Sequence, residues 1–402
     1  TAAVRAAAAA AATMAAPAQA SSLLTSAIDG LRNVSYKECM RRAAKRDDSF
    51  QSLVQQASAS CRKGLQSFYC QRVADVPGIR DSPPMAKFCG EGNEGGSGEV
   101  LAESAHSPLE TRMVFFVLAY GYPDNIGRLL LKLVGWAHRV LVHVDAKKQD
   151  YFQRLQSWVH QHAVTNVDVV SKFKVNRGGV STLNAWLYGM SWLLANAGQW
   201  DYFMNLNDSD YPIASLGALS RFLWLNRGAN FVNVGSAYKD CDCGRFLVYE
   251  CGDELYSIAP EMHYPRRPAL HHASGPNLVA ISAPLARYID STRGLAGSPV
   301  RQVLEDLGIL QQPDEKFFQT VMLNSPFCGR HVRWSFHIWD RPGLKGDARS
   351  PEVAGPELKM LTPPLLSEAF WPRLVEVKER RYAVFFARKF DNQKTAGLQD
   401  AL

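Results

Sequence analysis

The sequence lacks several features that would assign a function directly. No G-x-G-x-x-G segment or P-loop follows its first strand-like segment, which disfavours a dinucleotide dehydrogenase or a P-loop kinase. No basic run with interleaved aromatic residues is present, so the formal net charge of +7 does not indicate a nucleic-acid-binding protein. No apolar stretch approaches the ~20 residues that a membrane-spanning helix needs. We therefore expect any membrane anchor to lie upstream of Thr1.

Cysteine pairs with the spacing of a zinc site are also missing. The eight cysteines include only one closely spaced pair, Cys241 and Cys243, and its spacing is not C-x-x-C. The even number favours disulfide bonds in an oxidising compartment, with buried free thiols as the alternative. Asn33-Val-Ser35 fits a glycosylation sequon. These features together favour a lumenal glycoprotein.

Composition divides the chain into four parts. Residues 1–22 form an Ala-rich leader or linker, which resembles the end of a signal or transit sequence. Residues 23–108 hold a small cysteine-containing region followed by a Gly- and Pro-rich flexible linker. We expect one catalytic domain over residues 109–393 and a tail over residues 394–402.

Strand-like and helix-like segments alternate from residue 113 onward. Strands that alternate with helices of this length predict an α/β fold with a parallel sheet and crossover helices, which is a Rossmann-like architecture. Proline breaks the second half into loops, which we expect to build the acceptor side of a site. The predicted strands are 113–120, 139–145, 166–170, 202–206 and 230–235, and the predicted helices are 125–136, 149–163, 181–196 and 215–226.

Two carboxylates follow the predicted strand at 202–206. Asp208 and Asp210 lie in a polar turn before Pro212, which cannot donate to a sheet and so ends the strand. Ligands bind at the carboxyl ends of strands in wound α/β folds. Two acids there are typical of a metal site or of proton-transfer chemistry. In the structural alternative, both side chains only accept hydrogen bonds from backbone amides.

Three further segments carry candidate site residues. Asp145 ends a predicted strand, where an acid either hydrogen-bonds a nucleoside or caps the following helix. Glu315 lies just after Pro313, where a carboxylate either acts as a general base or stabilises the helix dipole. Arg388 and Lys389 end an apolar run, and they either neutralise a diphosphate leaving group or belong to a solvated basic tail.

Eight motifs occur in order between Met113 and Phe390. They are Phe115-Phe-Val-Leu118, His143-Val-Asp145, Gly178-Gly179, Phe203-Met-Asn-Leu206 through Asp210-Tyr-Pro-Ile213, Ser274-Gly275, Glu315 with Phe317-Phe318, Asn324-Ser-Pro326 with Cys328, and Phe385-Phe-Ala-Arg-Lys-Phe390. Together they resemble the core-2/I-branching and peptide O-xylosyltransferase family of glycosyltransferases. The last two motifs and Tyr211-Pro-Ile213 resemble the xylosyltransferase branch more closely. Residues 1–108 are not covered by the resemblance.

The resemblance implies a fold, a reaction and a cellular setting. The fold is GT-A, and the reaction transfers xylose or N-acetylglucosamine from a UDP-sugar, with inversion, to a hydroxyl of a protein or glycan. The setting is the Golgi lumen, with a type II membrane anchor. The resemblance also implies that no divalent metal is needed, because basic side chains hold the diphosphate.

The resemblance further implies roles for single residues. Glu315 matches the base of the branching enzymes, and Asp210 matches the strand-end acid assigned that role in xylosyltransferases. We favour Glu315 as the base, with Asp210 positioning the acceptor. The residues expected to bind the nucleotide-sugar are Asp145, Val117, Gly178, Arg388, Lys389 and Arg381. The residues expected to bind the acceptor are Asp208, Ser274 and Trp339.

Two alternatives remain open. Asp208-Ser-Asp210 is a literal D-x-D sequence, and family members typically lack an acid at the first position. A Mn²⁺-dependent GT-A enzyme that uses Asp208 and Asp210 is therefore one alternative. The other is a non-catalytic, lectin-like or nucleotide-sugar-binding relative. The chain also lacks cysteine after Asp340, where xylosyltransferases carry extra cysteines and a further domain, and this disfavours a proteoglycan-type peptide acceptor.

Overall fold

The chain forms two compact units, Thr1–Ser82 and Pro83–Leu402. Several features named above lie outside the residues that the structure describes: Arg381, the Asn33 sequon, residues 1–22 and four of the cysteines. The computed structural model describes residues 48–72, 111–234, 247–258, 270–339, 365–366, 370–379 and 383–402.

The described part of the first unit is a pair of helices, α4 (Asp48–Gln56) and α5 (Ala59–Arg72). The ring of Phe50 stacks on Tyr69 with 3.7 Å between the centroids, which joins the two helices. Each of the four described cysteines, Cys61 and Cys70 on α5 and Cys251 and Cys328 in the second unit, takes part in a disulfide bond. The prediction of disulfides is thus confirmed for the described cysteines.

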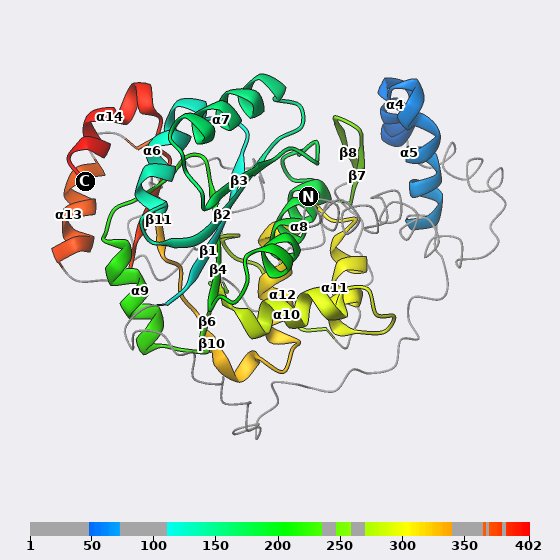
Figure 1. Cartoon of the computed structure of the whole chain (residues 1–402). Coiled ribbons are helices and arrows are strands. Elements are labelled where there is room, and N and C mark those ends of the chain that lie inside the picture. The colour runs from blue at the N-terminus through cyan, green and yellow to red at the C-terminus, as the bar shows by residue number, and fades with distance from the viewer. Residues whose placement is uncertain are drawn as a thin grey trace, which may run out of the picture. The chain divides into compact units, whose positions relative to one another are not determined.

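A central sheet organises the second unit (Figure 1). Within the described residues it has seven strands in the order β10-β6-β9-β4-β1-β2-β3. The strands β1 to β4 are parallel, and β9 runs antiparallel to β4 and β6. The predicted α/β class and parallel sheet are confirmed. The strands are β1 (Met113–Ala119), β2 (Ala137–Val144), β3 (Val167–Val170), β4 (Tyr202–Asn207), β6 (Asn230–Phe231), β9 (Ala280–Ser282) and β10 (His331–Val332).

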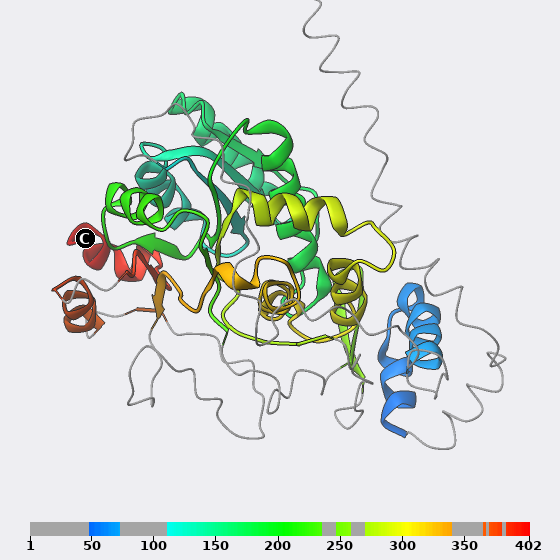
Figure 2. The same cartoon turned by 90° about the horizontal axis from the view of Figure 1, so that it is seen from below.

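Helices cover both faces of this sheet (Figure 2). One face packs on α6 (Pro123–Leu133), α7 (Gln149–Gln161) and α9 (Leu216–Leu225), whose apolar residues form one core with β1 and β2. The other face carries α8 (Val180–Asn196) and α10 (Ala283–Thr292). The shorter segments nearby are α11 (Pro299–Leu307), η2 (Pro313–Glu315), α12 (Phe317–Leu323) and η3 (Cys328–Arg330). None of the helices in the described ranges is long and apolar enough to cross a membrane.

Chain segments distant in sequence meet in a second, small sheet. Its strand order is β11-β12-β5, with β11 at His337–Trp339, β12 at Phe386–Arg388 and β5 at Asp210–Pro212. Strand β12 is antiparallel to β5 and parallel to β11. The register places Arg388 opposite Asp210 on one side and Trp339 on the other.

The last residues form helix α14 (Asn392–Asp400), which includes most of the segment expected to be a tail. Leu398 is buried there, and the Gln399 amide donates a hydrogen bond to Asn125 Oδ1 on α6. A mostly polar segment with so few apolar residues shows no helical periodicity, so its sequence does not predict this packing. Helix α13 (Trp371–Glu379) precedes it.

Helix α8 approaches β1 very closely at Gly189. A Cβ added at Gly189 would lie 2.1 Å from Cδ2 of Phe116 on β1, and Phe116 is fully buried. We expect Gly189→Ala to reduce the free energy of unfolding by about 1–3 kcal/mol, because the core must be overpacked to fit the methyl group. Chemical denaturation measures this change.

Gly135→Ala is the matched control, because nothing lies within 4 Å of a Cβ built at Gly135. We expect it to change the free energy of unfolding by less than about 0.5 kcal/mol. A Gly189→Ala variant as stable as the wild type would contradict this close packing of α8 on β1.

Candidate active site

Asp208 anchors the loop that follows β1. Its Oδ2 accepts hydrogen bonds from the backbone N–H groups of Tyr120, Gly121 and Tyr122, each at 2.8 Å. The Tyr151 hydroxyl lies 3.4 Å from the same oxygen. Burial raises the pKa of Asp208, and the three amides oppose that increase. The structural alternative therefore describes Asp208 well, although its amide partners come from the β1–α6 loop and not from its own turn.

One oxygen of the first acid of the D-x-D sequence is thus already engaged by the backbone. A metal ion would compete with three backbone amides for the lone pairs of Asp208 Oδ2. Among the described residues, no group of three or more His, Cys, Asp or Glu side chains is arranged to hold a metal ion. The other oxygen, Oδ1, is buried without a hydrogen-bond partner in the described part of the chain. A contact between Asp208 and the acceptor stays a prediction.

Asp210, the first residue of β5 in the second sheet, is fully buried. Its Oδ2 accepts from the backbone N–H of Asn207 at 2.8 Å, which closes the turn itself. Arg388 Nε lies 3.4 Å from Oδ1, and His337 Nε2 lies 3.7 Å from Oδ2. Burial raises the pKa of Asp210 to about 6, although Arg388 lowers it. Burial and Arg388 hold the pKa of His337 well below its usual value, so the imidazole is neutral.

Glu315 is the more accessible of the two candidate bases. It is partly exposed at the end of η2, and its carboxylate makes no hydrogen bond to the described residues. Burial raises the pKa of Glu315 to about 7, and the neighbouring Asp314 raises it further, whereas Lys316, Arg388 and Arg177 lower it. A partly exposed carboxylate with this pKa has the properties of a general base near neutral pH.

Ser274 lies beside the Glu315 segment. The backbone N–H of Gly275, the next residue, donates to the Glu315 carbonyl at 2.9 Å. Asn277 donates through its side chain to Asp314 Oδ2 at 2.8 Å, which fixes the residue before Glu315. The loop that carries Ser274 is thus held against η2, where the acceptor is expected.

Lys389 and Arg388 belong to the same site. Lys389 is 8% exposed, and burial lowers its pKa to about 8, with Arg388 and Arg177 lowering it further. The Arg388 guanidinium lies 3.4 Å from Asp210, and its charge also lowers the pKa of Glu315. The alternative of a solvated basic tail is wrong for this pair, because β12 is paired in a sheet and largely buried.

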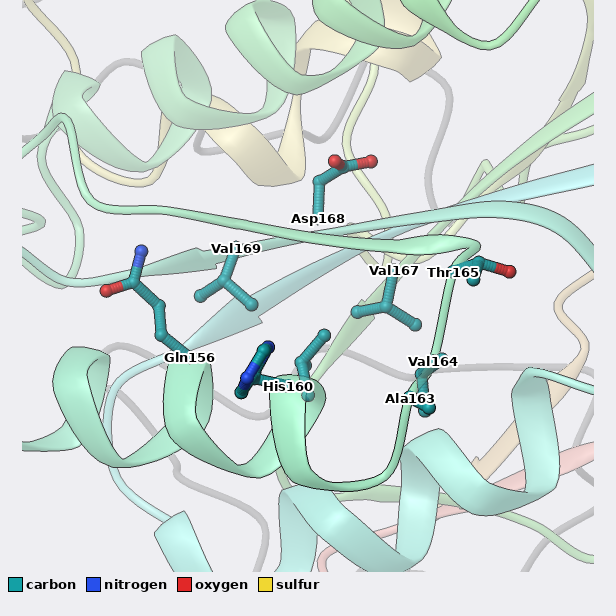
Figure 3. Close-up of a pocket in the computed structure, with 9 residues that line it drawn as sticks. Gln156, His160, Ala163, Val164, Thr165, Val167, Asp168 and Val169 are labelled. Carbon is teal, nitrogen blue, oxygen red and sulfur yellow. The ribbon is translucent and has the colours of Figure 1, made fainter.

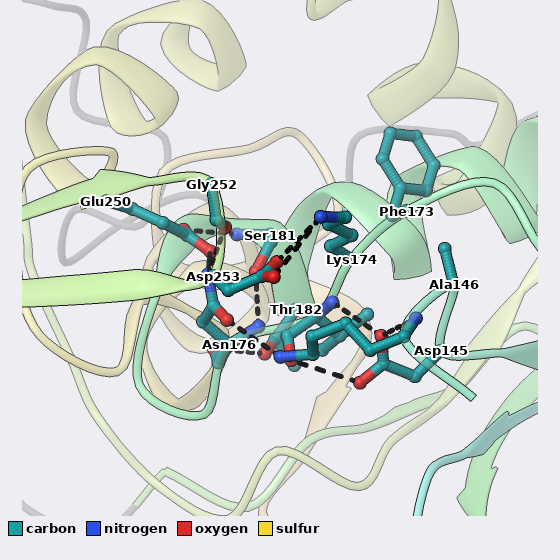
Figure 4. A network of polar contacts seen from close by, with 12 residues as sticks. Asp145, Ala146, Phe173, Lys174, Asn176, Ser181, Thr182, Glu250, Gly252 and Asp253 are labelled. Atoms are coloured by element: carbon teal, nitrogen blue, oxygen red, sulfur yellow. Dashed lines mark hydrogen bonds and ion pairs between the residues drawn. The ribbon is translucent and has the colours of Figure 1, made fainter. Parts of the chain in front are cut away.

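Asp145 supports the turn after β2. Its Oδ1 accepts from the backbone N–H groups of Lys147 at 3.0 Å and Val175 at 3.1 Å (Figure 4). It does not cap the following helix. The N-cap residue of α7 is Lys148, and no side chain makes a capping hydrogen bond there. Asp145 instead ties the end of β2 to the loop before α8. Its contact with the nucleotide stays a prediction.

Glu250 occupies the N-terminus of helix α8. It lies on β7 (Leu247–Cys251), which forms a hairpin with β8 (Glu254–Ile258). Its Oε2 accepts from the Ser181 backbone N–H at 2.9 Å, and its Oε1 accepts from Asn176 Nδ2 at 2.8 Å (Figure 4). A helix N-terminus attracts anions, and it is a common diphosphate site in wound α/β folds. Here a carboxylate of the chain already fills that position.

Gly178 connects this loop to the Glu315 segment. It has a φ of +82°, which suits glycine, and its carbonyl accepts from the Gln312 backbone N–H at 2.9 Å. Arg177, the residue before it, acts electrostatically on Lys389, Asp314 and Glu315. Sequence analysis did not identify Arg177, although a cation directly before Gly178-Gly179 was a usable signal.

Tyr120 is a second site residue that sequence analysis missed. Burial raises its pKa to about 12, with Asp208 and Asp210 raising it and Arg388 lowering it. Its hydroxyl therefore stays protonated at neutral pH and responds to the charges of the site. No feature of the apolar segment that ends at Tyr120 distinguishes it from a core residue.

Val117 lies in the middle of β1, paired with Val142 and Leu206 in the neighbouring strands. Its side chain is fully buried in the core, so the predicted contact with the nucleotide-sugar remains untested. Trp339 pairs in register with Arg388, which places it near the basic residues.

A surface depression of about 520 Å³ lies elsewhere, between α7 and β3 (Figure 3). Residues of these two elements line it, among them Gln156, His160 and Asp168. It includes none of the predicted site residues.

Comparison with known protein families assigns the chain to a family. The sequence model of the Core-2/I-branching enzyme family matches residues 114–358, more than half of the chain. The chain belongs to the Core-2/I-branching enzyme family. This match confirms the predicted family, and the parallel-dominated sheet agrees with the GT-A-like fold expected for its members.

Similar curated proteins are named xylosyltransferases. Xylosyltransferase oxt of Drosophila pseudoobscura pseudoobscura is 29% identical over 276 residues, which cover 66% of this chain and 30% of that protein. Xylosyltransferase 1 of Rattus norvegicus is 26% identical over 311 residues, which cover 73% of this chain and 36% of that protein. The chain therefore matches about a third of the length of these relatives. Within the family, it lies on the xylosyltransferase side.

We expect Asp208→Asn to reduce the free energy of unfolding by about 1–3 kcal/mol, because three charge-assisted hydrogen bonds to the β1–α6 loop become neutral ones. Thermal unfolding in EDTA measures this loss. The wild type should unfold at the same temperature with EDTA and with Mn²⁺. If EDTA lowered the wild-type unfolding temperature to that of the variant and Mn²⁺ restored it, Asp208 would be a metal ligand.

Proposed function

We propose that the chain is an inverting, UDP-sugar-dependent glycosyltransferase that transfers xylose or N-acetylglucosamine to a hydroxyl of a protein or glycan. One observation carries the proposal. Glu315 is a partly exposed carboxylate with a pKa of about 7, and the charges of Arg388 and Arg177 act both on it and on Lys389. A base next to a cluster of cations suits the transfer of a sugar away from a diphosphate.

In the proposed reaction, Glu315 removes the proton of the acceptor hydroxyl. The acceptor oxygen forms a bond to the anomeric carbon while the bond from that carbon to the diphosphate oxygen breaks. Attack from the face opposite the leaving group inverts the configuration. The electron pair of the broken bond leaves with UDP, whose negative charge Arg388 and Lys389 stabilise.

Glu315 suits the role of base better than Asp210. Asp210 is fully buried and is engaged with the Asn207 amide and Arg388, so an acceptor hydroxyl cannot reach it without rearrangement. Glu315 is partly exposed and has no hydrogen bond to the described residues. We propose that Asp210 instead orients Arg388, because the two residues are opposite each other in the β5–β12 pair.

We propose that the diphosphate is held by side chains without a divalent metal. The helix N-terminus that could bind it is filled by Glu250, and the first acid of the D-x-D sequence is engaged with amides. Among the described residues, Lys389 and Arg388 are side chains that can neutralise it. The disulfide-bonded cysteines fit an oxidising compartment, and we propose a Golgi lumenal setting.

A donor panel tests the function. Purified protein is incubated in EDTA with UDP-xylose, UDP-N-acetylglucosamine and other UDP-sugars, and the release of UDP is measured. We expect slow hydrolysis of one donor, which identifies the sugar. Activity that requires Mn²⁺ would contradict the metal-free mechanism. UDP binding without hydrolysis or transfer would favour the lectin-like alternative.

We expect Glu315→Gln to lower kcat roughly 10²–10⁴-fold, because the amide cannot accept the acceptor proton, while the Kd for UDP changes little. Glu305→Gln is the matched control. It makes the same chemical change on α11, where Glu305 pairs with Arg301 at 2.8 Å, and should leave kcat unchanged. A Glu315→Gln variant within a few-fold of the wild type would show that another group is the base.

The pH dependence of kcat/KM for the donor should be narrow and bell-shaped. Glu315 must be ionised to act as a base, so activity falls as the pH drops below its pKa of about 7. Lys389 must be protonated to bind the diphosphate, so activity also falls as the pH rises above its pKa of about 8. Initial rates at low donor concentration measure both limbs. A profile that is flat between pH 6 and pH 9 would contradict both assignments.

A further inference from the structure

Glu250 makes an unusual set of contacts with the loop before helix α8. Its two carboxylate oxygens bind different partners, the Ser181 backbone N–H and the Asn176 side chain. Asn176 is itself buried, and its amide also donates to the Gly252 carbonyl at 2.9 Å in the same hairpin. The β7–β8 hairpin is thereby joined to residues 176–181 on both sides of Gly178-Gly179.

The loop is shaped to receive this carboxylate. A Cβ added at Gly179 would lie 2.5 Å from Glu250 Oε2 and 2.6 Å from its Cδ. Gly179 has a φ of −91° and a ψ of 169°, which any residue adopts without strain. The absence of a side chain at this position therefore serves the close approach of Glu250 and not an unusual backbone conformation.

The same loop carries Arg177, whose charge lowers the pKa values of Glu315 and Lys389. Arg177 follows Asn176, which Glu250 holds, and precedes Gly178, whose carbonyl binds the Gln312 amide at 2.9 Å. Gln312 begins the turn that leads to Glu315. The backbone on either side of Arg177 is thus fixed, to the hairpin on one side and to η2 on the other.

We propose that Glu250 is a positioning residue for the donor. It holds residues 176–179 so that Arg177 faces the diphosphate together with Lys389. This inference rests on the proposed function and adds to it a third cation and the residue that orients it. Glu250 itself does not touch the donor, because its oxygens are engaged with α8 and with Asn176.

Glu250→Gln tests the inference. The amide retains one acceptor but places an N–H₂ group against donors, so the loop loses its charge-assisted hydrogen bonds. We expect the Kd for UDP, measured by calorimetry in EDTA, to rise about three- to tenfold. Gly179→Ala should give the same increase, because its methyl group displaces the same carboxylate. If Glu250→Gln does not fold, Gly179→Ala still tests whether the contact of Glu250 with the loop is needed for UDP binding.

Asp253→Asn is the matched control on the same hairpin. Asp253 pairs with Lys174 at 3.1 Å, and both side chains are more than half exposed, so this pair does not hold residues 176–179. We expect its Kd for UDP to equal that of the wild type. An increase as large as that of Glu250→Gln would assign the effect to the hairpin as a whole and overturn the specific role of Glu250.

A double-mutant cycle separates positioning from general stability. If Glu250 acts through Arg177, then Glu250→Gln should raise the Kd for UDP much less in an Arg177→Gln background than in the wild type. Additive effects would overturn the inference and leave Glu250 with a structural role. Arg177→Lys should retain part of the affinity that Arg177→Gln loses.

The outcomes distinguish this inference from the proposed function. A wild-type protein that does not bind UDP would overturn the proposed function, and this inference with it. A wild-type protein that binds UDP, together with Glu250→Gln and Gly179→Ala variants that bind it equally well, would overturn this inference alone.

Discussion

The pairing of β12 with β5 is the constraint on which the site depends. It places Arg388 opposite Asp210, although the two residues are far apart in the sequence. Because β5 directly follows the turn at the end of β4, this pairing brings the basic pair of the C-terminal segment to the carboxyl ends of the parallel strands. Without it, Asp210 would be a buried carboxylate with no guanidinium beside it, and Lys389 would have no fixed position.

A second constraint follows from the distribution of negative charge. Asp208 is engaged with three loop amides, and Glu250 fills the N-terminus of α8. Each acid satisfies backbone donors that would otherwise attract an anion or remain unpaired. We therefore expect positively charged side chains, and not backbone N–H groups, to bind the diphosphate. Burial and repulsion from Arg388 and Arg177 lower the pKa of one of them, Lys389, to about 8.

The sequence predicted the parallel strands and their helices because hydrophobic periodicity is a local signal. It also identified Glu315, Asp210, Arg388 and Lys389, which the structure brings into one region. It could not predict Glu250 or Arg177, because their roles depend on contacts between segments distant in sequence. For Asp208, sequence analysis left metal binding, proton transfer and backbone hydrogen bonding open, since only the folded β1–α6 loop shows where its three amide partners lie.

Calorimetric titration of UDP in EDTA tests the central claim most directly, on the wild type and on Lys389→Gln. The account predicts that the wild type binds UDP without a metal and that Lys389→Gln raises the Kd roughly tenfold, because one charge-assisted contact to the diphosphate is lost. Binding that requires Mn²⁺ and that is equally tight in both proteins would contradict it.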